Sequence, residues 1–284
     1  MCLASGIYWD CVKTRRSRTG LWRVSHFVVV SVLLSFPWLA SCSAKPASLD
    51  AIIAQKTGVV SDNYIRRLSS FVEVNGWTFA VVRGDAVPHR IYIEGDGRAY
   101  ISKGQPSDDP TPVNPVALRL MLADKEAGAM YVARPCQWVK GPECKDRTLW
   151  TEGRFTKNVV DRYVQLVARE SMGQPVELVG YSGGAFIALQ VAARLPNVSK
   201  VVAIAGNLMP DWVNEQHKVT KIPVVPYPPF KRDLPVMAYV GINDLVVGGG
   251  VVRAFEAETG LSVEVIEVQA THGTGWDGLV IGDK

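Results

Sequence analysis

The stretch VELVGYSGGAFIAL, residues 176–189, decides the fold of this chain. Its first residues predict a short buried strand, its last residues open a helix, and Gly180-x-Ser182-x-Gly184 lies between them. A strand-to-helix turn this tight forces its central residue into a strained backbone conformation, and small flanking glycines relieve the crowding. We therefore expect the Ser182 hydroxyl to project above the end of the strand, beside a helix N-terminus that favours negative charge.

Outward from this stretch, short apolar runs alternate with helical patterns, and no break in composition divides the chain after residue 60. The predicted strands span residues 77–82, 90–93, 130–133, 176–179, 200–204, 236–240 and 263–268. The predicted helices span residues 115–127, 158–170, 184–195 and 251–259. Strands that alternate with helices in this way are typical of an α/β protein with a mostly parallel central sheet flanked by helices.

The motif in this context resembles the nucleophile elbow of the α/β-hydrolase superfamily, and the resemblance covers roughly residues 77–281. It implies an α/β-hydrolase fold and a serine hydrolase with Ser182 as its nucleophile, whereas a structural Ser-Gly turn is the alternative. In that superfamily the nucleophile, the acid and the histidine follow one another along the chain, on loops after successive strands. Residues 207–229 lie where family members insert a lid, but the segment is short and rich in proline, so we expect a small lid or none.

A serine nucleophile needs a general base, and histidine suits this role because its side chain titrates near neutrality. Of the four histidines, His26 lies in the leader, His89 precedes the motif and His217 lies in a segment predicted to be irregular. His272 follows the last predicted strand, within ATHGTG at residues 270–275, and is where the resemblance places the base. The alternative for His272 is an ordinary position in a surface loop.

The acid of such a triad orients the imidazole and stabilises its protonated form. Asp244 comes directly off the predicted strand 236–240 and precedes a helix, which is the position that the family assigns to the acid. Asp211, off the preceding strand, is the second candidate, and a turn-forming role is the structural alternative for Asp244. Asp277 is too near the histidine in sequence for an easy approach.

The family holds the oxyanion with two backbone N–H groups, and the resemblance places one of them at Gly183. The second is expected in the Glu-Gly-Asp-Gly segment after the second predicted strand, at the amide of Asp96 or, alternatively, of Gly95. The match is partial, because the glutamate stands where the family commonly has histidine. Since a carboxylate repels a forming oxyanion, we expect the Asp96 side chain to turn away, toward Arg98 or Arg134.

The N-terminal residues resemble a bacterial signal peptide. A basic stretch is followed by an apolar run over residues 24–40 that carries no charge, contains Pro37 and is short for a membrane span. The run ends in Leu39-Ala40-Ser41-Cys42, which resembles the lipobox of bacterial lipoproteins, whose cysteine is acylated and becomes the mature N-terminus. We therefore expect an exported protein of the cell envelope that is held on a membrane by lipid at Cys42. An ordinary cleaved signal or an anchor helix is the alternative.

The chain is thus expected to comprise a signal peptide over residues 1–41, a tether over 42–58 and an α/β-hydrolase domain over 59–284. Removal of the leader and lipidation account for three of the five cysteines, which leaves Cys136 and Cys144. In an oxidising compartment we expect these two to form a disulfide that closes a short loop, with two reduced thiols as the alternative. A zinc site is not expected, because no histidine lies close enough to complete one.

The distribution of charge bears on possible partners. Of the 31 basic and 27 acidic residues, five and one lie in the leader, so the body of the chain holds 26 of each. The body has no block of Lys and Arg that would neutralise a phosphate backbone, so nucleic-acid binding is not expected. No phosphate loop, dinucleotide fingerprint or metal-ligand cluster is found in the sequence, and we expect no cofactor.

The expected reaction is hydrolysis of a carboxylic ester, of a small molecule or a lipid, through an acyl-enzyme. The fold also serves acyl transfer, thioesters and peptides, so an acyltransferase, thioesterase or peptidase on the same triad is an alternative. A lipoprotein that uses a hydrolase scaffold only for binding is another. The joint presence of Ser182, Asp244 and His272 speaks against that last alternative.

Overall fold

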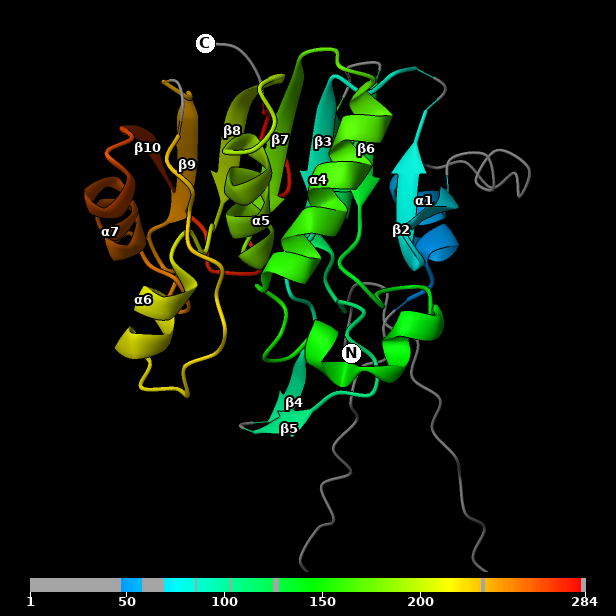
Figure 1. The fold of residues 1–284 in the computed structure, drawn as a ribbon, viewed down its shortest axis with the longest axis horizontal. Coiled ribbons are helices and arrows are strands. Elements are labelled where there is room, and N and C mark those ends of the chain that lie inside the picture. Colours follow the sequence, from blue (N-terminus) through cyan, green and yellow to red (C-terminus); the bar gives the residue numbers. More distant parts are fainter. Residues whose placement is uncertain are drawn as a thin grey trace, which may run out of the picture. The chain divides into compact units, whose positions relative to one another are not determined.

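The computed structural model describes residues 47–57, 69–84, 86–102, 104–124, 128–230 and 233–281, so the expected signal peptide and Cys42 lie outside the described residues. Within these ranges the centre of the fold is an eight-stranded sheet with the order β1-β2-β6-β3-β7-β8-β9-β10 (Figure 1). Its strands are β1 (Ser69–Val74), β2 (Trp77–Arg83), β3 (Arg90–Ile93), β6 (Ala129–Val132), β7 (Val176–Tyr181), β8 (Val198–Ile204), β9 (Val236–Gly241) and β10 (Val263–Val268).

The sheet is parallel over most of its width. Strand β2 runs antiparallel to β1 and β6, whereas β6, β3, β7, β8, β9 and β10 pair in parallel. All four residues of β3 are buried, as expected of a parallel strand that is covered on both faces. Ile91 and Ile93 point into one core cluster, and Tyr92, between them, points into the other.

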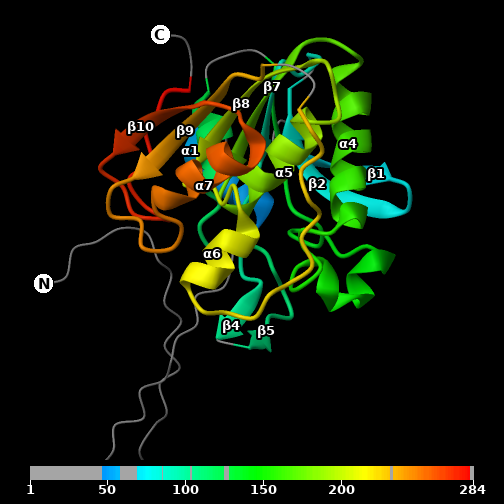
Figure 2. The ribbon, with the colours of Figure 1, turned by 60° about the vertical axis from the view of Figure 1, so that its left-hand side comes forward.

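Helices supply the two outer layers (Figures 1 and 2). They are α1 (Leu49–Thr57), α3 (Val116–Ala123), α4 (Lys157–Ser171), α5 (Gly183–Ala192), α6 (Pro210–Gln216) and α7 (Gly250–Thr259). Helices α4, α5 and α7 bury apolar side chains in the cluster on one face of the sheet, and α1 and α3 do so on the other face. The predicted α/β-hydrolase fold, a mostly parallel sheet flanked by helices, is confirmed.

Helix α1 lies where the sequence predicted part of a tether. A tether was expected over residues 42–58, but Leu49–Thr57 forms a helix. Its side chains Ile52 and Ile53 are buried in the same cluster as those of α3, and Ile53 is fully inaccessible. These residues therefore belong to the folded domain, because extended linkers do not bury apolar side chains in a core.

Strand β1 was not among the predicted strands. It pairs with β2 through a two-residue turn, Asn75-Gly76, in which both residues have positive φ, 45° and 81°. Asn-Gly between two apolar runs is a strong hairpin signal, since both residues tolerate the left-handed region. The sequence thus contained the information for this strand.

The segment 207–229 forms only a small cover. It contains the short helix α6, with Pro210 in its first turn, where a missing N–H costs nothing. After α6 the chain has no further helix or strand before β9 among the described residues, apart from one bridge between Phe155 and Val224. The expectation of a small lid or none is confirmed, whereas the irregular segment expected around His217 contains the short helix α6, which ends just before that residue.

Candidate active site

Ser182, Asp244 and His272 meet at the carboxyl end of the sheet. They follow β7, β9 and β10, which are parallel, so their loops emerge at one edge. His272 Nε2 lies 3.0 Å from Ser182 Oγ, and His272 Nδ1 lies 2.9 Å from Asp244 Oδ2. The imidazole thus bridges the hydroxyl and the carboxylate, although 90 residues separate it from the former and 28 from the latter.

The backbone at Ser182 is in the conformation expected of an elbow. Its φ is 50° and its ψ is −122°, outside the regions that a serine ordinarily adopts. Hydrogen bonds hold this conformation from both sides, since the Ser182 N–H donates to Ile204 O at 3.0 Å and its carbonyl accepts from the amides of Ala185 and Asn207. A Cβ at Gly180 or Gly184 would overlap neighbouring backbone atoms. The glycines of the motif are therefore required by the close approach of strand and helix.

The Asp244 carboxylate is ionised and oriented by its surroundings. Its side chain is 2% exposed, and Oδ1 accepts hydrogen bonds from the amides of Val246 and Val247. Burial alone would raise the pKa of Asp244, but the hydrogen bond and charge of His272 and these two amides hold the pKa below its ordinary value. The carboxylate is thus fixed as the partner of His272 Nδ1.

The other two aspartates considered for the acid lie elsewhere. Asp211 is exposed in the first turn of α6, and no interaction between it and His272 is present. Asp277 forms an ion pair with Arg119 at 3.3 Å. Asp244 alone of the three contacts the imidazole among the described residues.

Two aromatic side chains that the sequence analysis did not assign to this role anchor the His272 loop. The hydroxyl of Tyr181 and the indole N–H of Trp276 both donate to the carbonyl oxygen of His272 at 3.0 Å. Trp276 is fully buried, and the ring of Tyr181 lies 5.5 Å from the imidazole centroid. They fix the height of the imidazole above the sheet. Tyr181 adjoins the nucleophile in sequence, but the roles of both depend on loop geometry that the sequence does not reveal.

The remaining described histidines lie away from the triad. His217 caps the C-terminus of α6, and its Nε2 lies 2.6 Å from the carbonyl oxygen of Val246. His89 lies just before β3, at the opposite end of the strand from Asp96. Neither contacts Ser182.

The backbone N–H groups of Gly183 and Asp96 have no hydrogen-bond acceptor among the described residues. Gly183 is the first residue of α5, so its N–H has no partner within the helix. The N–H of Gly95 donates to Glu94 Oε1 at 3.0 Å and is occupied. The N–H of Asp96 has no acceptor in the part of the chain that the structure describes. Of the two alternatives for the second donor, Asp96 therefore has the available amide.

The Asp96 carboxylate is held by two arginines. Oδ1 pairs with Arg134 at 3.2 Å and Oδ2 with Arg154 at 2.8 Å. Arg134 was one of the two expected partners; Arg154 was not expected, and Arg98 contributes a backbone hydrogen bond to Pro110 instead. Both guanidinium groups also lie over the ring of Phe155, at 5.4 and 5.0 Å from its centroid.

Glu94 is a buried carboxylate that joins the Asp96 loop to helix α3. Its oxygens accept from the amides of Gly95, Ala117 and Leu118, and it is hydrogen-bonded to the Tyr131 hydroxyl. Burial raises the pKa of Glu94 to about 7, against the lowering effect of these hydrogen bonds. Where the family commonly has histidine, this chain therefore has a carboxylate that caps the first turn of α3.

The predicted disulfide between Cys136 and Cys144 is present, with a Cα–Cα distance of 5.7 Å. It closes the loop that carries the 3-10 turn Pro142–Lys145, and Glu143 of this turn accepts a hydrogen bond from the amide of Thr78.

No cluster of His, Cys, Asp and Glu suited to a metal ion is found in the described residues. None of the helices in the described ranges has the length and apolarity needed to cross a bilayer.

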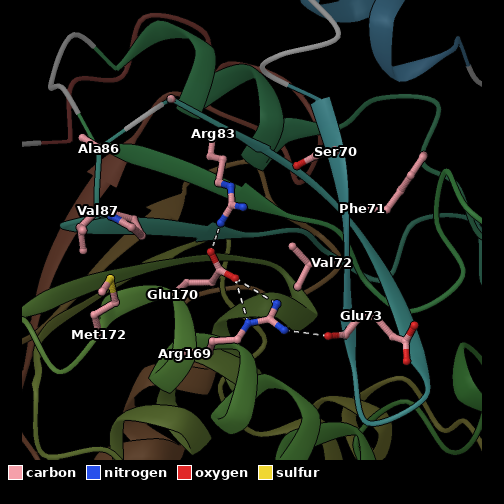
Figure 3. A pocket seen from close by; sticks show the side chains of 12 residues that line it. Ser70, Phe71, Val72, Glu73, Arg83, Ala86, Val87, Arg169, Glu170 and Met172 are labelled. Carbon is pink, nitrogen blue, oxygen red and sulfur yellow. Dashed lines mark hydrogen bonds and ion pairs between the residues drawn. The ribbon is translucent and has the colours of Figure 1, made fainter.

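A cavity of about 920 Å³ lies apart from the triad, between β1, the connection from β2 to β3 and the end of α4 (Figure 3). Glu170 lies between Arg83 and Arg169 and pairs with both. Arg169 also donates to the carbonyl oxygen of Glu73. Glu170 and the two arginines thus satisfy one another, and no residue of the triad lines this cavity.

Comparison with known proteins gives matches at the level of structure only. No protein-family model matches the chain, and no curated protein matches it. A serine hydrolase homologue from Coxiella burnetii is 17% identical, with a TM-score of 0.47 over 72% of this chain and 88% of that protein. The likeness is one of fold.

Two further solved structures show a similar relationship. Alpha/beta hydrolase domain-containing protein 10 from mouse is 16% identical, with a TM-score of 0.48 over 72% of this chain and 90% of that protein. A dienelactone hydrolase from Anabaena variabilis is 17% identical, with a TM-score of 0.46 over 72% of this chain and 86% of that protein. One fold hosts many reactions, so the activity of this chain is argued from its own side chains.

Proposed function

We propose that this chain is a serine hydrolase that cleaves a carboxylic ester through Ser182, His272 and Asp244. The observation that carries the proposal is the continuous hydrogen-bonded path from Ser182 Oγ through the imidazole to Asp244 Oδ2, with distances of 3.0 and 2.9 Å. A hydroxyl within reach of a base, and a base oriented by a third group, are the requirements for an activated nucleophile.

In this mechanism His272 Nε2 takes the proton of Ser182 as Oγ attacks the ester carbonyl. Asp244, whose pKa is held low, keeps the proton on Nδ1 and stabilises the imidazolium that forms. The amides of Gly183 and Asp96 donate to the oxyanion, and each such donor contributes about 3 to 4 kcal/mol in the transition state.

The tetrahedral intermediate then collapses and the bond to the leaving alkoxide breaks. His272 returns its proton to that oxygen, which leaves an ester on Ser182 Oγ. Water, deprotonated by His272, attacks this acyl-enzyme and releases the acid and the free serine. No step requires a metal or an organic cofactor.

A fluorophosphonate probe tests the nucleophile. We expect it to label the wild-type chain and not Ser182→Ala, and we expect hydrolysis of acyl esters of graded chain length to disappear in the same variant. Ser199→Ala, which removes a hydroxyl that bonds Val176 O near the start of β8, is the matched control and should retain both signals. Labelling that persists in Ser182→Ala would exclude this function, and the absence of any labelling would favour a binding role.

We also propose that the chain is exported and anchored in a bacterial envelope membrane through lipid on Cys42, and that it acts there on a small-molecule or lipid ester. The Cys136–Cys144 disulfide supports export, because such bonds persist in oxidising compartments. Several acyl chains on one cysteine give lasting attachment, since each buried CH₂ contributes about 0.8 kcal/mol. Metabolic labelling with a fatty acid should mark the wild type and not Cys42→Ala; equal labelling of both would exclude this anchor.

A further inference from the structure

The loop of residues 94–97, which follows β3, lies directly against the candidate nucleophile. A Cβ at Gly95 would come within 3.1 Å of Ser182 Cβ. The N–H of Asp96, the second candidate oxyanion donor, belongs to the same peptide group as the carbonyl of Gly95. In a trans peptide these two bonds point in opposite directions, and the described residues contain no cis peptide bond. Whatever holds the Gly95 carbonyl therefore sets the direction of the Asp96 N–H.

One buried side chain, that of Gln137, holds this carbonyl. Gln137 Nε2 donates to Gly95 O at 2.9 Å, and Gln137 is fully inaccessible to solvent. Its Oε1 accepts from the backbone N–H of Arg134 at 3.0 Å. Because one partner is a backbone carbonyl and the other a backbone N–H, only this orientation of the side-chain amide satisfies both. The amide is thus fixed with its donor toward Gly95.

The turn that carries Gln137 is itself held in place. It follows β6, which pairs in parallel with β3, so the two loops leave the sheet at the same edge. Cys136 and Trp138, on either side of Gln137, have positive φ of 67° and 66°, and Cys136 is bonded to Cys144. The Gln137 N–H donates to Arg134 O at 3.2 Å. The side chain therefore extends from a backbone with little conformational freedom.

Gly97 gives the Gln137 amide room to reach the loop. It leads to the hairpin of β4 (Tyr100–Ser102) and β5 (Gln105–Pro106). Its φ is 64°, and a Cβ at this position would lie only 2.7 Å from Gln137 Nε2. A larger residue would have to displace the amide, so glycine here permits the contact between Gln137 and Gly95.

We propose that Gln137 is a positioning residue for ester hydrolysis, which holds the peptide between Gly95 and Asp96 with the Asp96 N–H directed at the oxyanion. The proposal rests on the proposed function, which uses that N–H as an oxyanion donor. Gln137 acts through the peptide and not on the ester. Its hydrogen bond also strengthens the donor, because hydrogen bonds on the two sides of one peptide group polarise each other.

Gln137→Met tests this role, because methionine fills the space of an unbranched side chain and donates no hydrogen bond. We expect kcat to fall by about tenfold or more while KM stays within about twofold, since the donor acts on the oxyanion and not on the bound ester. The inhibition constant of an alkylboronic acid, whose tetrahedral adduct on Ser182 mimics the oxyanion, should rise by a factor similar to the fall in kcat.

Gln190→Met is the matched control. Gln190 is also fully buried, and its Nε2 donates to the backbone carbonyl of Val225 at 2.9 Å. Both variants leave a buried carbonyl without its donor, so both should lower the urea midpoint of unfolding. Only Gln137→Met should lower kcat. An unchanged kcat in Gln137→Met, a rise of KM alone, or an equal fall of kcat in the two variants would overturn the proposal.

Gln137→Asn provides a second test if the methionine variant does not fold. It keeps a side-chain amide but is one methylene shorter, so it cannot bridge Arg134 N and Gly95 O. We expect the same separation of kcat from KM at a smaller size, with kcat lower by about threefold or more. Full kcat in a folded Gln137→Asn protein would contradict the role.

Nuclear magnetic resonance separates this proposal from the catalytic one. The chemical shifts of the Gly95 carbonyl carbon and the Asp96 amide nitrogen report the hydrogen bond at Gly95 O without any turnover. Both should move in Gln137→Met or Gln137→Asn and stay in place in Gln190→Met. If the wild type neither hydrolyses esters nor reacts with a fluorophosphonate, the catalytic proposal fails while these shifts still decide whether Gln137 holds the peptide. Shifts that stay in place in a folded Gln137 variant would refute the positioning role.

Discussion

The carboxylate of Asp96 lies against the Cα of Gly183, so closely that a Cβ at Gly183 would overlap Asp96 Oδ1. Asp96 has no room to withdraw, because Arg134 and Arg154 hold its two oxygens. The two residues whose amides are the candidate oxyanion donors are thus packed directly on each other. The distance between them is set by the salt-bridged side chain of Asp96 and by the lack of a side chain at Gly183.

Gly183→Ala should therefore lower kcat for ester hydrolysis by about 100-fold or more, the effect expected when one oxyanion donor is displaced. The added methyl group must push the Asp96 loop away from α5. Steady-state kinetics measures the loss, and circular dichroism checks that the variant folds. Gly84→Ala, where a Cβ meets no atom within 4 Å, is the matched control and should keep full activity. A folded, fully active Gly183→Ala protein would show that the two amides do not act together.

The arginine pair around Asp96 should matter for stability as well. Arg134 is 3% exposed, so Asp96→Asn leaves a buried guanidinium without its counter-charge. Because Asp96 itself retains some exposure, we expect a loss of about 3 kcal/mol in the free energy of unfolding, at the low end for a broken buried pair. Urea denaturation measures it. Asp161→Asn, which removes the partner of the exposed Lys157, should cost no more than about 0.5 kcal/mol; similar losses in the two variants would show that the buried pair contributes little.

The assignment of the acid gives a direct comparison of two aspartates. Asp244→Asn keeps the size of the side chain but removes the charge opposite His272 Nδ1, so kcat should fall by about 10³ to 10⁴. Asp211→Asn, on the exposed first turn of α6, should leave kcat within about twofold. Kinetics of the two purified variants on one ester gives the answer. A larger loss of kcat in Asp211→Asn than in Asp244→Asn would identify Asp211 of α6 as the acid.

Much of the fold could be predicted because the pattern of each element was local. Strands β3 and β10 have the predicted bounds, and the elbow stretch shows a strand, a turn and a helix in direct succession. Helix α1 was missed because its two buried isoleucines gain meaning only from packing against α3. Helix α6 was missed because it is short and starts at a proline within a proline-rich segment, a pattern that predicts a loop as readily as a first helical turn.

The candidate site likewise contains residues that could be predicted from the sequence and residues that could not. Ser182, Asp244 and His272 could be chosen because each follows a recognisable strand in a fixed order along the chain. The link from Arg154 to Asp96 could not, since the two residues are 58 positions apart and no local pattern relates them. In the sequence, Glu94 was noticeable only because it stands where the family motif commonly has histidine. Its burial and its three amide donors depend on how α3 docks against the end of β3.

Glu94 makes the stability of the fold depend on pH. Burial raises its pKa from 4.5 to about 7, so the folded protein holds this proton more tightly than the unfolded chain does. The stabilisation is complete below about pH 4.5 and is lost progressively as the pH rises to about 7. A shift of this size corresponds to about 3 kcal/mol.

Glu94→Gln should remove this component, because the amide of glutamine does not titrate. The difference between the unfolding free energies of Glu94→Gln and the wild type should therefore move in favour of the variant by about 2 to 3 kcal/mol between about pH 5 and pH 8. Urea denaturation at the two pH values measures it, and groups that titrate alike in both proteins cancel. Glu267→Gln, an exposed carboxylate on β10, should show no such drift. A difference that stays constant with pH in Glu94→Gln would mean that the buried carboxylate is ionised throughout, held by the amides of Gly95, Ala117 and Leu118.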